Sequence, residues 1–175
     1  MILFLLVIGF LILVVFVIVY FKDVLPLMFH GAPWQPSEVE SIRKMLEMAE
    51  LKQGEKVYDL GSGDGRILIM AAEEFGAQAT GIEINPFLVL YSRLRVWAKR
   101  LNDKVKIIGA DMFKIDISEA DVLVLFQREE TNERLKEKLS TEMKKGARLV
   151  SYVWQMKNWE PEKSDSSLGI YLYKI

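Results

Sequence analysis

Strand-like and helix-like segments alternate along residues 56–175, and this alternation restricts the fold more than any other feature of the sequence. The strand-like segments are short, apolar and rich in β-branched residues: KVYDL (56–60), QATGIEI (78–84), KVKIIGA (104–110), ADVLVLF (120–126), ARLVSYVW (147–154) and GIYLYKI (169–175). Helical patterns occupy 65–75, 86–100 and 130–145. Strands that alternate with helices predict an α/β fold with a mostly parallel sheet, right-handed crossovers and helices on both faces.

A glycine-rich turn follows the first predicted strand. Gly61, Gly63 and Gly65 lie two residues apart, in the pattern G-x-G-x-G. A dinucleotide-binding turn has the spacing G-x-G-x-x-G, and a phosphate-binding P-loop ends in Gly-Lys-Ser/Thr, which is absent from this sequence. Ligands of open parallel sheets bind beyond the carboxyl ends of the strands, so this turn lies where a ligand is expected.

Acidic residues at the ends of three predicted strands indicate which ligand fits. Asp59 and Asp64 disfavour a pyrophosphate and suit a ligand with an amino group or a positive centre. Glu83 ends the second strand about 20 residues later, the usual position of a carboxylate that binds ribose hydroxyls. Asp111, after the third strand, can accept a hydrogen bond from an adenine amino group. S-adenosylmethionine has these groups and no phosphate, although solvated acidic residues are the alternative interpretation.

The composition narrows the chemistry that the chain can perform. With 23 basic and 24 acidic residues it lacks the basic excess of a typical nucleic-acid-binding protein, so no nucleic-acid partner is expected. It has no cysteine, which excludes disulfides, thiolate catalysis and cysteine-ligated zinc. The single histidine, His30, cannot form a multi-histidine metal site, and no carboxylate spacing suggests another site, so no metal is predicted.

Residues 2–21 form an uncharged apolar run. About 20 apolar residues are enough to span a bilayer as a helix. A signal peptide would carry a basic segment before the run and small residues at a cleavage site, and the sequence has neither. We therefore expect residues 1–22 to be a transmembrane anchor, which makes the membrane bilayer a partner of this chain.

A connector with three prolines, residues 23–36, separates the expected anchor from the rest of the chain. Proline disfavours helix there. Ser37 and Glu40 form a capping-box pattern, which predicts that a helix begins with Ser37 as its N-cap. The folded domain is expected to cover residues 37–175.

Three motifs resemble those of the class I S-adenosylmethionine-dependent methyltransferases: VYDLGSGDGRI (57–67), GIEINP (81–86) and GAD (109–111). Three further segments are similar to one branch of that family: APWQPSEVESIRKML (32–46), INPFLVLYSRLRVWA (84–98) and KKGARLVSYVWQMKNWEP (144–161). This branch contains the archaeal protein-lysine methyltransferases and the mitochondrial membrane-anchored lysine methyltransferases of the ATP synthase c subunit and the adenine-nucleotide translocase. The resemblance implies a Rossmann-like class I methyltransferase sheet, here preceded by one N-terminal transmembrane helix, and a protein-lysine N-methyltransferase with a protein substrate.

The same motifs imply which residues bind the cofactor, S-adenosyl-L-methionine. They are Asp59, Gly61, Gly63, Glu83 and Asp111, with Asp64 and Ser37 as weaker additions. The chain departs from the family in being short after the fifth predicted strand. The helix that usually follows is missing, so the substrate side is expected to be open.

The methyl acceptor is expected to approach past the ends of the fourth and fifth predicted strands. Gln127 can hydrogen-bond an incoming amine, and Tyr152 and Trp154 can hold an ammonium group against their rings. These three are the catalytic candidates, with core packing as the alternative role of the two aromatic residues. Glu129 and Glu130 can attract a cationic side chain or simply favour a helix N-terminus.

Other functions stay open from the sequence. A methyltransferase of a lipid, quinone or other small molecule is the first alternative, and a non-catalytic cofactor-binding scaffold is the second. Arg93, Arg95, Lys99 and Arg100 lie on one predicted helix, where they can contact anionic lipid or be solvated. Because S-adenosylmethionine is an intracellular metabolite, we expect a single-pass membrane protein with its catalytic domain in the cytoplasm, or in the mitochondrial matrix of a eukaryote.

Overall fold

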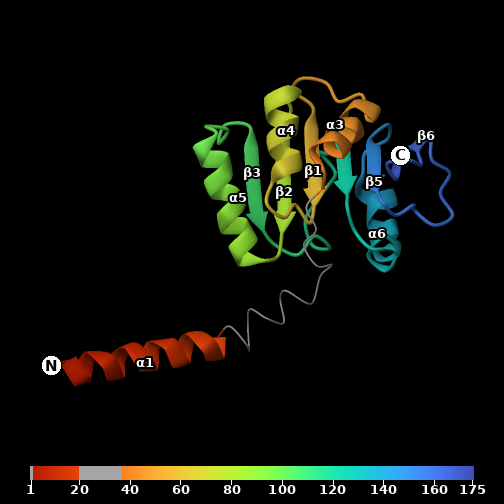
Figure 1. Ribbon diagram of the computed structural model, residues 1–175. Coiled ribbons are helices and arrows are strands. Elements are labelled where there is room, and N and C mark those ends of the chain that lie inside the picture. The colour runs from red at the N-terminus through yellow and green to blue at the C-terminus, as the bar shows by residue number, and fades with distance from the viewer. Residues whose placement is uncertain (1, 20–36) are drawn as a thin grey trace. The chain divides into compact units, whose positions relative to one another are not determined.

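The computed structural model describes residues 2–19 and 37–175, which belong to two compact units, Met1–Trp34 and Gln35–Ile175 (Figure 1). The predicted connector, residues 23–36, and His30 within it lie outside the described residues. Each unit is taken by itself below.

The described residues of the first unit form the helix α1 (Ile2–Val19), of 18 residues. It has no acidic residue in its first turn and no basic residue in its last. Large apolar side chains such as Phe4 and Phe10 are about two-thirds exposed. Within the described part of the chain, no helix has both the length and the apolar character that crossing a membrane requires.

The second unit is built on one seven-stranded sheet with the strand order β3-β2-β1-β4-β5-β7-β6. Its strands are β1 (Lys56–Leu60), β2 (Gln78–Glu83), β3 (Val105–Gly109), β4 (Val122–Leu125), β5 (Arg148–Tyr152), β6 (Lys163–Asp165) and β7 (Ile170–Lys174). The first five strands are parallel, and β7 runs antiparallel between β5 and β6. The prediction of a mostly parallel sheet is confirmed, and all six predicted strands are present. Strand β6 was not predicted, because its three polar residues carry no apolar pattern.

The register aligns the carboxyl ends of the parallel strands along one edge of the sheet. Leu60 of β1 pairs with Ile82 of β2 and with Leu125 of β4. Leu125 pairs in turn with Ser151 of β5. Most of the predicted cofactor and acceptor residues lie within a few residues of these positions, so the fold brings both groups to the same edge.

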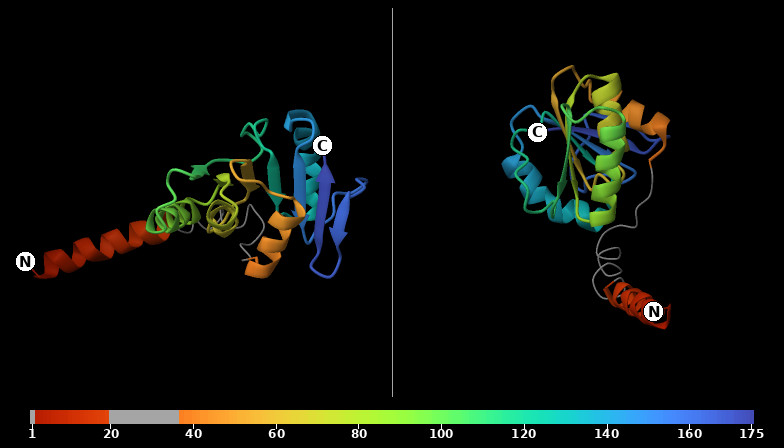
Figure 2. Two further views of the ribbon diagram at one scale, coloured as in Figure 1. Left: turned by 90° about the horizontal axis from the view of Figure 1, so that it is seen from above. Right: turned by 90° about the vertical axis from the view of Figure 1, so that its left-hand side faces the viewer.

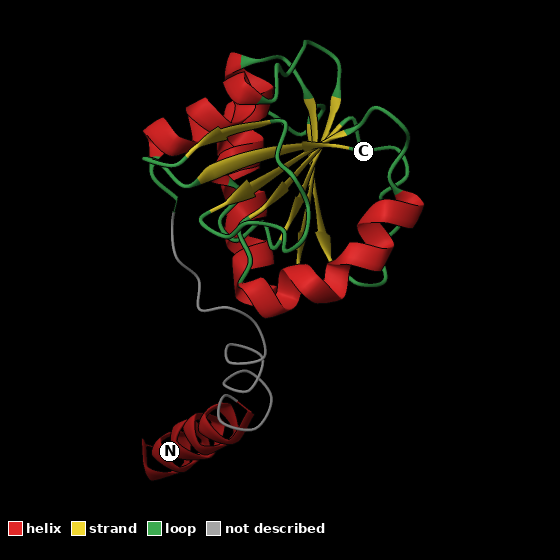
Figure 3. Ribbon diagram, turned by 90° about the vertical axis from the view of Figure 1, so that its right-hand side faces the viewer, coloured by secondary structure: helices red, strands yellow, loops and turns green. Residues whose placement is uncertain are grey.

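Helices cover both faces of the sheet, as predicted (Figure 2). The helices of the second unit are α3 (Val39–Met48), α4 (Arg66–Glu74), α5 (Pro86–Ala98) and α6 (Glu129–Glu142). Side chains of α3, α4 and α5 join one apolar core, and those of α6 join a second core. Figure 3 shows helices on both sides of the sheet. Along β4, Val122 and Val124 enter the first core, whereas Leu123 and Leu125 enter the second. Fully burying a side chain of this kind contributes about 1.5–3 kcal/mol, so both faces stabilise the sheet.

Of two helix starts predicted from the sequence, one is confirmed and the other is wrong. Asn85 is the N-cap of α5, with its side chain accepting from the backbone N–H groups of Phe87 and Leu88, and Pro86 occupies the first turn as predicted. The prediction that Ser37 caps the first helix of the domain is wrong, because Glu38 is the N-cap of α3 and no side chain caps it. Ser37 is buried one residue earlier, where its carbonyl has another partner described below.

The crossovers after β3 and β5 contain no helix in this structure. Residues 110–121 and 153–162 connect the strands as turns and irregular segments. The missing helix after the fifth strand is therefore confirmed. The edge of the sheet near β5 is bordered by a loop instead.

Candidate active site

The glycine turn after β1 uses backbone conformations that favour glycine. Gly61, Gly63 and Gly65 have φ values of 91°, 54° and 76°. The N–H groups of Gly61 and Ser62 both donate to the carbonyl of Ile82, at 2.8 and 2.9 Å, which fastens the turn to the end of β2. A Cβ atom on Gly61 would collide with the side-chain nitrogen of Gln127. The turn therefore needs glycine both for its backbone angles and for the close approach of Gln127.

Asp59 is buried at the end of β1, with 2% of its surface exposed. Burial, together with the nearby carboxylates of Glu83 and Asp64, raises the pKa of Asp59 from 3.8 to about 8. All three causes act in the same direction. A cationic group bound beside Asp59 would offset them by favouring the charged form. Asp59 thus fits the ammonium group of an amino-acid moiety.

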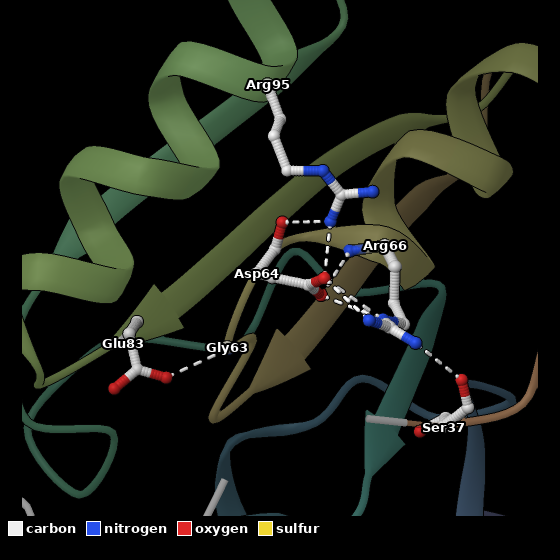
Figure 4. Close-up of polar contacts among 6 residues, drawn as sticks. All are labelled: Ser37, Gly63, Asp64, Arg66, Glu83 and Arg95. Carbon is white, nitrogen blue, oxygen red and sulfur yellow. Dashed lines mark hydrogen bonds and ion pairs between the residues drawn. The ribbon is translucent and has the colours of Figure 1, made fainter. Parts of the chain in front are cut away.

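Glu83 ties the glycine turn to the segment after β2. Its Oε2 accepts from the N–H of Gly63 at 2.9 Å (Figure 4), and its Oε1 accepts from the N–H of Asn85 at 2.8 Å. A carboxylate has about four acceptor sites, so both oxygens can still accept from the hydroxyl groups of a ribose. The ribose role of Glu83 was expected from the sequence, but these two backbone bonds were not.

Asp64 lies inside the turn, between two arginines (Figure 4). Its carboxylate forms ion pairs with Arg66 at 2.8 Å and with Arg95 at 2.5 Å. Burial alone would raise the pKa of Asp64, but the hydrogen bonds and charges of the two arginines outweigh it and hold the pKa below its usual value. The charge of Asp64 is therefore paired within the protein, and its role toward the cofactor stays a prediction.

Arg66 also reaches the start of the domain. Its Nη1 donates to the carbonyl of Ser37 at 2.9 Å (Figure 4). Ser37 is thus fixed through its backbone beside the glycine turn, and its role as a cofactor ligand stays a prediction. Nothing in the sequence indicated that Arg66 and Arg95 bind Asp64, because these contacts depend on how α4 and α5 pack.

Asp111 lies two residues beyond the end of β3. Its Oδ1 accepts from the N–H of Phe113 at 3.0 Å, which orients the carboxyl group at the start of the loop. The side chain is partly buried at the same edge of the sheet as Glu83. Contact with an adenine amino group stays a prediction for this residue.

Gln127 connects the cofactor side of the edge to the acceptor side. The side chain is buried and lies after β4, with its Nε2 donating to the carbonyl of Leu60 at 2.9 Å. This bond leaves the amide oxygen available as an acceptor. Because Gln127 lies against Gly61, a group held by its oxygen would be next to the glycine turn.

The two aromatic candidates at the end of β5 lie in different surroundings. Tyr152 is partly buried, with its ring centre 4.7 Å from that of Phe126 and its hydroxyl 3.3 Å from Ser41 Oγ. Trp154 is 43% exposed on the following loop. Tyr152 thus has a packing role, whereas Trp154 is accessible to a substrate.

Trp154 lines a surface pocket of about 740 Å³ in the loop after β5. Glu129 from the first turn of α6 and Glu160 contribute to the same pocket. Trp159 also lines it, but its ring packs edge-on against Tyr173 with the ring centres 6.0 Å apart. Lys157 also lines the pocket, so its charged residues are two glutamates and one lysine. An exposed indole in a pocket of net negative charge suits a cationic side chain.

A buried polar contact that the sequence did not indicate supports this loop. Asn132 of α6 and Ser151 of β5 are both fully buried. Asn132 Nδ2 donates to Ser151 Oγ at 3.5 Å, and Ser151 Oγ donates to the carbonyl of Trp154. This buried contact fixes the position of the backbone at Trp154. In the described residues, no group of three or more histidine, cysteine, aspartate or glutamate side chains could hold a metal ion.

The strand order and the glycine turn above β1 define the class of this protein, a Rossmann-like, S-adenosylmethionine-dependent methyltransferase. Two solved structures illustrate the fold. A Salinibacter ruber structure described as an RNA methyltransferase with S-adenosyl-L-homocysteine has a TM-score of 0.78 and 35% identity, over 81% of this chain and 94% of that one. A Geobacter sulfurreducens S-adenosylmethionine-dependent methyltransferase has a TM-score of 0.61 and 22% identity, over 77% of this chain and 57% of that one.

The sequence profile of the ANTKMT methyltransferase domain matches residues 59–163, more than half of the chain, and the chain belongs to this family. The resemblance drawn from the motifs is therefore confirmed. A protein-lysine N-methyltransferase of Saccharolobus islandicus is 37% identical over 82% of this chain and 93% of its own length. The human lysine N-methyltransferase that acts on the ATP synthase c subunit is 34% identical over 74% of this chain but only 55% of its own length.

Proposed function

We propose that this chain transfers a methyl group from S-adenosylmethionine to the side-chain amine of a lysine in a protein. The observation that carries the choice of acceptor is the 37% identity to the archaeal protein-lysine N-methyltransferase across nearly all of that relative. The pocket of Trp154, Glu129 and Glu160 supports it, because its chemistry suits a cationic side chain.

The residues at the edge of the sheet fit the cofactor. Asp59 would accept from the ammonium group, Glu83 would accept from the ribose hydroxyls, and the glycine turn leaves room for close approach. Asp111 would contact the adenine. When bound, the cofactor supplies an electrophilic methyl group on a sulfonium. The protein's task is to align the acceptor with that methyl group and to exclude water, which can contribute several kcal/mol through orientation.

The acceptor side must present lysine as a neutral amine. A free lysine has a pKa of about 10.4, and removal from water lowers it, because burial disfavours the charged form. In our proposal Glu129 attracts the cationic side chain at the pocket, and the indole of Trp154 then replaces water around it. The Gln127 amide oxygen accepts one N–H of the amine, which leaves the nitrogen lone pair directed at the methyl group. A dedicated base is not needed in this scheme.

We also propose that residues 1–22 anchor the enzyme to a membrane as a single-pass protein, with the catalytic domain in the cytoplasm or the mitochondrial matrix. The proposal rests on the sequence: residues 2–21 contain no charge, and a helix of that length rises about 30 Å. An anchor would raise the local concentration of membrane-protein substrates. Carbonate extraction of membranes and protease access in sealed vesicles test the insertion and the orientation. A protein released by carbonate would contradict the anchor.

Incubating the full chain and isotope-labelled cofactor with membranes of the same source tests the acceptor. We expect label in protein, and mass spectrometry should locate it on lysine. Label in the organic extract would instead support a lipid or quinone acceptor. Binding of the cofactor with no transfer would support the scaffold alternative.

RNA is a second candidate acceptor, because the Salinibacter structure at 35% identity is described as an RNA methyltransferase. The net charge of −1 does not favour it. The labelling experiment should therefore include purified RNA. Ribonuclease-sensitive label would replace lysine with RNA as the acceptor.

A further inference from the structure

Helix α5 exposes a row of large apolar side chains on the side that faces away from the sheet. We call this row the α5 stripe, and its members are 48–69% exposed: Ile84, Phe87, Leu90, Tyr91, Leu94 and Trp97. Within the helix they recur at spacings of three and four residues, so they lie along one side. Figure 1 shows α5 as the outermost helix of the domain, beside β3.

The opposite side of α5 is also apolar and is the side that packs on the domain. Val89, Ser92 and Val96 are buried there, and the two valines belong to the first apolar core. A helix with large apolar side chains on two sides is normally covered on both. Since only one side of α5 is covered in the described part of the chain, the stripe indicates a partner that is not part of this domain.

Two exposed arginines on α5 and directly after it carry charges that no carboxylate of the described residues neutralises. Residues 84–108 contain six basic residues and one acidic residue, but Arg95 pairs with Asp64 and Lys99 pairs with Glu73. Arg93 donates to the carbonyl of Ile107 at 2.9 Å. Neither Arg93 nor Arg100, both exposed, takes part in an ion pair among the described residues. The partner should therefore be apolar and negatively charged.

Three kinds of partner can be compared on these properties. A second copy joined through the same face would bring Arg93 and Arg100 of both copies together, which is unfavourable. RNA would satisfy the charge, but the aliphatic members Ile84, Leu90 and Leu94 have no ring on which a base can stack. A bilayer with anionic lipid satisfies both properties, since aromatic and leucine side chains enter the interface while cations attract the headgroups.

We infer that the α5 stripe is a docking surface for an anionic lipid bilayer, separate from the N-terminal apolar helix. The stripe begins at Ile84, directly after Glu83, so docking would hold the cofactor edge of the sheet close to the lipid surface. The inference concerns the catalytic domain alone. It does not depend on which group the enzyme methylates.

Vesicle flotation of residues 35–175 tests this inference. This part of the chain is a compact unit that contains both apolar cores, so it has what it needs to fold without the preceding residues. Vesicles of phosphatidylcholine alone are compared with vesicles that also contain the anionic phosphatidylglycerol. We expect tight binding to the anionic vesicles and at least about tenfold weaker binding to the neutral ones.

Two variants separate the apolar and the electrostatic contributions. The double variant Leu94→Ser, Trp97→Ser should lose about tenfold or more of the binding. The double variant Arg93→Gln, Arg100→Gln should lose about fivefold for each cation and most of the preference for anionic lipid. Val39→Ser, which changes a 58% exposed valine of α3, and Lys145→Gln are the matched controls and should bind like the wild type.

The outcomes are decisive in both directions. No binding to either vesicle, or binding that the stripe variants leave unchanged, would overturn the inference. A concentration-dependent dimer that Leu94→Ser, Trp97→Ser abolishes, or RNA binding that displaces the vesicles, would also overturn it in favour of those partners. Calorimetric binding of S-adenosylhomocysteine should be the same in all variants, which shows that they fold. Lipid docking without methylation of any lysine would contradict only the proposed function, whereas lysine methylation without docking would contradict only this inference.

Discussion

Replacing Asp59 with asparagine is expected to stabilise the ligand-free domain while weakening its hold on the cofactor. Burial next to two other carboxylates raises the pKa of Asp59 from 3.8 to about 8. Between these pH values the folded domain keeps a proton that the unfolded chain has released, so the stability of the domain falls as the pH rises. Asparagine needs no proton. The gain in stability from Asp59→Asn should therefore increase with pH and level off near pH 8.

The size of this gain follows from the shift in pKa. Each unit of pH above the unfolded pKa is worth about 1.4 kcal/mol. The gain is then on the order of 1–2 kcal/mol near pH 5 and on the order of 4 kcal/mol near pH 7. A domain of this size changes its Tm by about 3 °C for each kcal/mol, so we expect Asp59→Asn to melt roughly 10 °C higher at neutral pH.

Thermal melting of residues 35–175 across this pH range measures the stability, and calorimetry with S-adenosylhomocysteine measures the affinity. Loss of the charged hydrogen bond should weaken binding by about 10- to 100-fold. Asp116→Asn is the matched control. Asp116 has its pKa lowered by hydrogen bonds from Ser118, so its loss should destabilise the domain above the unfolded pKa, with the opposite sign. A difference in Tm for Asp59→Asn that is negative, or that does not change with pH, would refute the reasoning.

Three further substitutions test other parts of the site. Gly61→Ala places a methyl group on a backbone with a φ of 91° and against Gln127, so we expect urea denaturation to show a loss of about 1–3 kcal/mol and calorimetry to detect no S-adenosylhomocysteine binding. Wild-type values for both would contradict the clash. Trp154→Ala should lower kcat/KM for protein methylation by about tenfold and leave cofactor affinity within about twofold. Equal losses in kcat/KM and in cofactor affinity would mean that Trp154 serves cofactor binding and not the acceptor. Asp64→Asn removes the carboxylate shared by two arginines and should cost about 1–3 kcal/mol of unfolding free energy, measured by urea denaturation. An unchanged urea midpoint would mean that these ion pairs contribute nothing to the free energy of unfolding.

The sequence was sufficient to predict six of the seven strands of the sheet, because these six are short apolar runs, most of them separated by helical patterns. It also placed Asp59 and Glu83 at adjacent strand ends, since parallel strands in this fold present their carboxyl ends along one edge. Local spacing alone carries this information. The same reasoning correctly left the segment after the fifth strand without a helix.

Contacts between residues far apart in the chain could not be read in this way. The capping-box pattern at Ser37 was misleading, because Arg66, 29 residues later, binds the Ser37 carbonyl and the helix begins at Val39. The pairing of Arg95 with Asp64 likewise depends on how α5 packs beside the glycine turn. The exposure of the α5 stripe could not be predicted from the sequence either. An apolar residue in a sequence is expected to be buried, and only the packed structure shows which side of α5 has no cover.

The bond from Arg66 to Ser37 has a consequence for how this domain can be combined with other segments. It fixes the chain at the first described residue of the domain, directly beside the turn that would hold the cofactor. The structural effects of changes in length or sequence before Ser37 should therefore not extend beyond this residue, and the geometry of the turn should stay intact. A catalytic unit insulated in this way can be joined to a membrane anchor, a targeting sequence or a longer leader without redesign of its site, and evolution can relocate the enzyme in the cell without altering its chemistry.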